Sequence, residues 1–147
     1  MDRDKRRALI IAITVGAILI GPLAALSPWG MDELEALAVR NSSKSWAGSL
    51  QLWCADGYAW TLRRDRERQA YETFYKEFTT DPRRGYAKFM MAACLDRGYQ
   101  ESKRAAAEAY EDFLEEFEDD ELFHTLPDWQ EYVRDAKRAI ERLRSIA

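Results

Sequence analysis

The chain has 147 residues and a net charge of −4, with 47% apolar and 33% charged residues. This length suits one domain, and the negative charge argues against a general nucleic-acid binder, which needs a basic surface. Because there are only 7 glycines and 4 prolines, and no alternating Val, Ile and Thr runs follow residue 26, the composition predicts an all-α protein.

An uncharged apolar run at residues 8–26 predicts an N-terminal transmembrane helix. A helix that crosses the hydrocarbon of a bilayer needs ~20 apolar residues, which this run nearly supplies. The anchoring positions are Ala8, Ile10, Ile13, Ile18, Leu19 and Leu23, with Trp29 at the membrane interface.

Charge on either side of this run predicts its orientation. Residues 1–7 are basic and acidic residues follow from Asp32, so the positive-inside rule predicts a cytoplasmic N-terminus and an extracytoplasmic domain, such as a bacterial periplasmic one. A cleaved signal peptide stays open as an alternative, although Leu23-Ala24-Ala25 is a poor cleavage site.

The rest of the chain divides into a linker with a short helix, residues 27–44, and a helical domain, residues 45–147. Asp32 is placed to cap the first helix, Asp81 and Pro82 to start the fourth, and Gly98 to end it in the left-handed conformation. The expected helices are 31–39, 45–60, 62–78, 82–97, 100–117 and 127–146.

A tryptophan stripe marks the second expected helix. Trp46, Leu50, Trp53, Gly57 and Trp60 are spaced 4, 3, 4 and 3, which places them on one helical face. Such a stripe lines either the core or a ligand groove, and the core is the favoured interpretation. The charged runs 63–68 and 115–121 are expected to be solvated faces, and the acidic run lacks the pattern of a calcium loop.

One nine-residue segment occurs twice. Residues 70–78 and 109–117 are identical at six of nine positions, at an offset of 39 residues, which is typical of a helical repeat array. The shared apolar positions form the expected repeat core: Ala70, Tyr71, Phe74 and Phe78 in the first copy, and Ala109, Tyr110, Phe113 and Phe117 in the second.

With Pro82 four residues after Phe78, this pattern resembles the second helix of a tetratricopeptide repeat (TPR). The resemblance implies an array of helical hairpins over about 45–117, with the last helix as a C-terminal cap, similar to bacterial envelope TPR proteins. Three features depart from the family. The period is 39 rather than about 34, Glu77 and Glu116 replace a small residue, and Glu121 replaces the second Pro.

No catalytic, cofactor or metal site is expected, since no nucleotide-binding or metal motif occurs and His124 is the single histidine. In a TPR-like array the 39-residue offset would bring Cys54 and Cys94 to similar heights on neighbouring helices. Two alternatives stay open for them: a disulfide, or two buried thiols.

These patterns predict a membrane-anchored protein–protein interaction scaffold or adaptor, whose partner is a membrane complex or an exported protein and not a nucleic acid. The alternative is a structural accessory subunit of a large membrane complex. An enzyme would need a buried carboxylate cluster that the sequence does not reveal.

Overall fold

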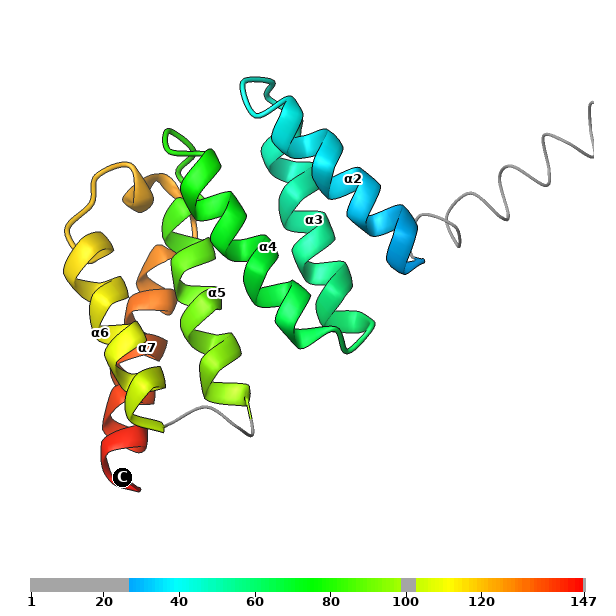
Figure 1. The fold of residues 1–147 in the computed structure, drawn as a ribbon. Helices are drawn as coiled ribbons and strands as arrows, with labels where there is room; N and C mark the ends of the chain where they lie inside the picture. Colours follow the sequence, from blue (N-terminus) through cyan, green and yellow to red (C-terminus); the bar gives the residue numbers. More distant parts are fainter. Residues whose placement is uncertain (1–26, 99–102, 147) are drawn as a thin grey trace, which may run out of the picture.

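The computed structural model describes residues 27–98 and 103–146, and within these ranges the helices are joined by turns and loops, with no strand (Figure 1). This confirms the all-α prediction for the described part of the chain. The elements are α2 (Pro28–Arg40), α3 (Ala47–Trp60), α4 (Arg64–Glu77), α5 (Arg84–Arg97), α6 (Lys103–Phe117), the short 3-10 helix η1 (Phe123–Thr125) and α7 (Trp129–Arg144).

The helices stack in chain order. Each packs mainly against the next in sequence, from α2 to α6, and α7 lies behind α6 and also touches α5 (Figure 1). The connections are short, so successive helices run in opposite directions. Helices that are not adjacent in sequence also meet: Arg66 of α4 reaches Asp32 of α2, and α7 touches α5.

The predicted location is corrected. Within residues 27–98 and 103–146, no helix combines the length and the apolar character that crossing a membrane requires. The expected anchor at 8–26 and the basic segment 1–7 lie outside the described residues. Trp29, expected at a membrane interface, belongs to α2. The single-pass arrangement with an extracytoplasmic domain is therefore withdrawn.

Two groups of buried side chains hold the stack together. The N-terminal core comprises Met31, Ala47, Leu52, Cys54, Ala55, Tyr58, Ala70, Tyr71, Phe74, Phe78 and Ala87. The C-terminal core comprises Ala92, Ala106, Ala107, Tyr110, Phe113, Phe117, Phe123, Val133, Ala136, Ala139, Ile140 and Leu143. Tyr75 packs against both cores, so they are continuous through α4.

Polar side chains tie α2 to its neighbours. The Tyr58 hydroxyl donates to Asp32 Oδ1 at 2.7 Å, and Arg66 Nη2 lies 2.8 Å from the same oxygen and 3.2 Å from Glu35 Oε2. The buried Gln51 of α3 donates to Glu35 Oε1 of α2 at 3.2 Å and also to the Ala70 carbonyl oxygen of α4 at 3.1 Å. The first helix is therefore held by directional bonds as well as by Met31.

The run 63–68 is only in part the solvated face that its mixed charges suggested, because Arg64 and Asp65 are exposed but Glu67 is buried. Glu67 is only 2% exposed and its carboxylate lies 2.6 Å from Arg97 Nη2, across the α4–α5 contact. Burying a carboxylate is unfavourable unless it is paired, which Arg97 achieves from thirty residues away. A local pattern could not reveal that partner.

Helix ends differ from expectation at three points. The Ser27 side chain caps α2 by accepting from the Gly30 N–H at 3.1 Å, so Asp32 is free to bind Tyr58. Asp81 accepts from the Arg83 N–H at 2.9 Å but caps a turn, because α5 begins only at Arg84. Gly98 ends α5 in extended backbone with φ of −71°, not in the left-handed conformation.

Candidate interaction surface

The tryptophan stripe of α3 is on the surface, so its assignment to the core is wrong. Trp46, Trp53 and Trp60 are 46%, 45% and 85% exposed, whereas Gly57 is buried against Met31. The two sides of α3 that face α2 and α4 are occupied by Ala47, Gly48, Gln51, Leu52, Cys54, Ala55 and Tyr58. The rings occupy the side that neither neighbour covers.

Beside this tryptophan row lies a cavity of about 240 Å³, here called the α3–α7 pocket. It is formed where alternate helices converge, and its lining residues are Leu52, Asp56, Arg83, Tyr86, Leu126, Pro127, Asp128 and Tyr132. Asp56 follows Trp53 by three residues and precedes Trp60 by four, so all three lie on neighbouring positions of one helix surface. The row and the pocket are therefore one continuous surface.

Packed tyrosines form the aromatic part of the pocket. The Tyr86 and Tyr132 ring centroids are 5.4 Å apart, and Phe89 lies 5.3 Å from Tyr132 in the C-terminal core. Tyr71 meets Tyr86 edge-on at 6.1 Å and donates its hydroxyl to Asp56 Oδ1 at 2.5 Å. Burial, followed by the charge of Asp56, raises the pKa of Tyr86, so its hydroxyl is neutral at physiological pH. The Tyr86 and Tyr132 rings are thus held in place by packing against Tyr71 and Phe89.

Among the described residues, the pocket has two carboxylates without an ion pair, while its one cationic side chain is already paired. Arg83 is fully engaged, because it contacts Asp81 at 2.7 and 2.9 Å and donates to Ser49 Oγ at 3.0 Å. Burial alone would raise the pKa of Asp81, but the bonds and charge of Arg83 outweigh it and hold that pKa below its usual value. Across residues 27–98 and 103–146, neither Asp56 nor Asp128 forms an ion pair.

A larger hollow of about 590 Å³ lies between the loops at 42–45 and 77–82. Its lining is rich in serine and threonine, and its half-buried carboxylate, Asp81, is already paired with Arg83. It offers less for recognition than the α3–α7 pocket.

The repeat-core residues lie together inside the stack. In α4 and directly after it, Ala70, Tyr71, Phe74 and Phe78 are buried; in α6, Tyr110, Phe113 and Phe117 are buried and Ala109 is half-buried. The two copies share an internal geometry, since Phe74 stacks on Phe78 at 4.8 Å and Phe113 on Phe117 at 6.1 Å. These residues support the surface without forming it.

The two cysteines are free thiols, so the disulfide is not formed. Cys54 lies on α3 and the half-buried Cys94 on α5, and α4 packs between those helices. Burial raises the pKa of each thiol to about 12, assisted by Glu35 at Cys54 and by Glu67 at Cys94. Both are therefore protonated and unreactive at neutral pH.

His124 has a structural environment. Its ring stacks on Trp129 at 3.8 Å, and its Nε2 lies 2.7 Å from the Glu118 carbonyl oxygen. No cluster of acidic, histidine and cysteine side chains suited to a metal ion occurs in the part of the chain that the structure describes.

Comparison with known proteins does not assign the chain to a family. The sequence matches no protein-family model, and a search of curated proteins finds no significant match. Nothing in these searches identifies a TPR family, so function must be argued from the surface itself.

Proposed function

We propose that this protein is a protein–protein interaction module, a scaffold or adaptor that binds a segment of a partner across the tryptophan row and the α3–α7 pocket. The single observation that carries the proposal is the exposure of Trp46, Trp53 and Trp60 on one side of α3. Contiguous apolar surface on a folded protein commonly marks an interaction site, and tryptophan, tyrosine and arginine dominate binding energy at interfaces.

A TPR-like architecture is part of this proposal. The hairpins α3–α4 and α5–α6 carry the two copies of the repeated segment, and α7 covers the end of the stack with one buried face. In helical repeat arrays, alternate helices line a shared surface that receives peptides. The α3–α7 pocket, built from alternate helices, has the position that such a surface would have.

The test replaces the three tryptophans by serine and compares capture of native partners by the variant and by the unchanged protein. We expect the variant to keep its helical circular dichroism and to lose the captured protein. The matched control replaces Ile146 by serine, a residue that is also exposed but follows α7 and does not line the pocket. Equal capture by both variants would contradict the proposal.

A second candidate, a structural subunit of a larger complex, is favoured by the outer face of α2. Trp29 and Leu37 are 76% and 43% exposed there, although terminal helices of repeat arrays normally present polar outer faces. Permanent association would cover them. Purification from native material distinguishes the two, because a subunit co-purifies at fixed stoichiometry and an adaptor does not.

A further inference from the structure

The proposed function leaves open the chemistry of the bound segment, and the inference drawn here rests on that function. We propose that the α3–α7 pocket receives a basic side chain of the partner, whose cationic head contacts Tyr86 and Tyr132 and is neutralised by Asp56 and Asp128.

The size of the cavity suits a single side chain. Its volume of about 240 Å³ is smaller than the ~300–1,000 Å³ typical of sites for whole small molecules. The lining combines apolar groups, Leu52 and Leu126, with aromatic rings and carboxylates. A lysine or arginine side chain has the matching build, because its alkyl stem prefers apolar surface and its head prefers charge.

Two comparable clusters in the same chain each contain a cation. Tyr58 has Arg63 and Arg66 over its ring at 4.9 and 5.3 Å, with Asp32 and Glu35 completing the group. This combination of tyrosine, carboxylate and cation is thus a recurring element of the fold.

The second filled cluster joins α4, α5 and α6. Tyr75 has Arg84 and Lys88 over its ring at 4.2 and 4.9 Å, and the Tyr75 hydroxyl and Arg84 both reach Glu116. The aromatic face attracts the cation electrostatically, and the carboxylate adds to that attraction.

The pocket has the same components, but its own cation, Arg83, is paired with Asp81 and does not lie over the tyrosine rings. Over the described ranges, no Lys or Arg head lies on the Tyr86 or Tyr132 ring, and Asp56 and Asp128 have no ion pair. The Arg83 guanidinium lies instead 5.8 Å from the Phe74 ring centroid. A cation from a partner would complete the third cluster.

The experiment is a nuclear magnetic resonance titration with two small probes, N-acetyl-lysine methylamide and N-acetyl-norleucine methylamide. The probes share an alkyl chain and differ in the charged head. We expect the lysine probe to shift the Tyr86, Tyr132 and Asp56 signals in a saturable manner that weakens with salt, and the norleucine probe to bind at least tenfold more weakly. Equal effects of the two probes would overturn the inference.

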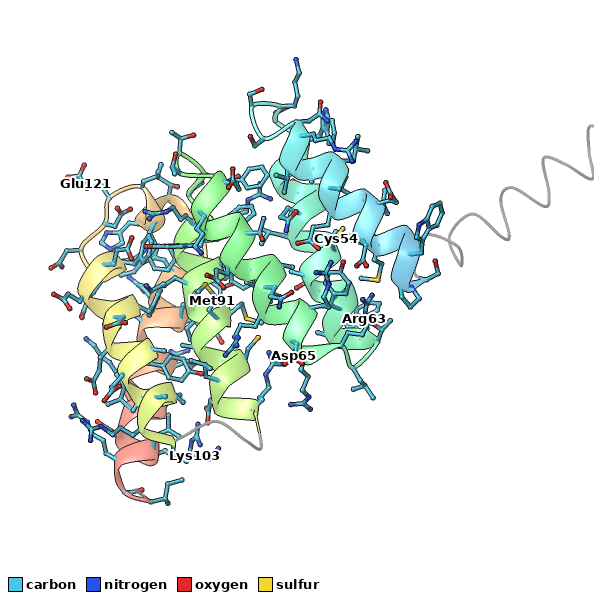
Figure 2. The ribbon with its side chains drawn as sticks, viewed as in Figure 1. Cys54, Arg63, Asp65, Met91, Lys103 and Glu121 are labelled. Carbon is cyan, nitrogen blue, oxygen red and sulfur yellow. The ribbon has the colours of Figure 1, made fainter. Side chains whose placement is uncertain are left out.

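Variants that remove the negative charges of the pocket test whether lysine binding depends on those charges. Asp56→Asn with Asp128→Asn is expected to abolish the response to lysine, while the asparagine oxygen still accepts from Tyr71. The control is Asp65→Asn, an exposed carboxylate in the first turn of α4 (Figure 2). If all variants respond to lysine as the unchanged protein does, the inference fails.

The two proposals fail in different ways. Loss of partner capture in the tryptophan variant, with no selective lysine binding, would retain the interaction function and overturn the basic-side-chain inference. Selective lysine binding together with capture that ignores the tryptophans would overturn the proposed function and, with it, the assignment of the lysine to a bound partner.

Discussion

The two cores of this molecule are built from different interactions. In the C-terminal core, rings contact rings: Phe113 lies 5.6 Å from Phe89 and 5.7 Å from Phe123, and Phe123 lies 5.7 Å from Phe117. The N-terminal core contains Tyr58 and has the buried polar residues Gln51 and Glu67 beside it, and each of the three has a hydrogen-bonded or charged partner on another helix.

The two halves also differ in how many large apolar side chains they expose, and here the first half exposes more. The large exposed apolar side chains of the first half are Trp29, Leu37, Trp46, Trp53, Trp60 and Leu62, whereas those of the second half are Leu122 and Ile146. In the second half, the aromatic side chains are buried or partly buried in the C-terminal core. The first half is held by directional polar bonds and leaves its tryptophans available for contact.

Removing a ring should have the largest effect, and more so in the C-terminal core. Phe113→Ala and Phe74→Ala are each expected to cost ~3–5 kcal/mol in the free energy of unfolding, with Phe113 at the upper end because it contacts three other phenylalanines. Urea denaturation measures both. Unchanged midpoints would mean that these rings do not support the stack.

A smaller effect is expected from glycines that accommodate a neighbour. A methyl group at Gly85 would lie 2.8 Å from Cε2 of Phe123, whose ring is fixed by the C-terminal core, so Gly85→Ala should cost ~1–3 kcal/mol. At Gly57 the neighbour is the flexible end of Met31, 2.7 Å away, so Gly57→Ala should cost less. Thermal unfolding of the pair tests this order, and the reverse order would contradict it.

Unpairing a buried charge should affect the N-terminal half. Glu67→Gln leaves Arg97 without its carboxylate and is expected to cost ~1–3 kcal/mol. The exposed pair of Lys76 and Glu72 supplies the control, since Glu72→Gln should change stability by less than ~0.5 kcal/mol. Chemical denaturation of both variants gives the comparison, and similar losses would remove the distinction between buried and exposed pairs.

The smallest expected effect depends on pH. The hydrogen bond from Tyr58, followed by the bond and charge of Arg66, lowers the pKa of Asp32. A carboxyl group with a lowered folded-state pKa stabilises the fold above its unfolded pKa of ~3.9, and this contribution is lost as pH falls through the folded value. Tryptophan fluorescence should report loosening of α2 below about pH 4. Asp32→Asn should lack this step, and persistence of the step would assign it to another group.

Sequence patterns predicted the helices and the inner faces of α4 and α6 because large apolar side chains mark those faces. They misplaced the tryptophan row because small residues such as Ala47, Ala55 and Gly57 fill the contacts of α3 with its neighbours. Periodicity identifies residues that share one helical face, but it does not show whether a neighbouring helix packs on that face. The α3–α7 pocket was missed for a different reason: its residues come from three segments, and no local spacing relates Asp56 to Tyr132.

The position of Cys54 has a consequence for how the molecule opens. This thiol lies on α3 near α2, close enough for Glu35 to influence it (Figure 2). Since α2 packs mainly on α3, its local unfolding need not disturb the rest of the stack. Opening of α2 would expose Cys54 to solvent and return its acidity to that of an ordinary thiol. The rate at which Cys54 reacts with an alkylating reagent therefore measures how often α2 detaches from α3. No added label is needed to follow this motion.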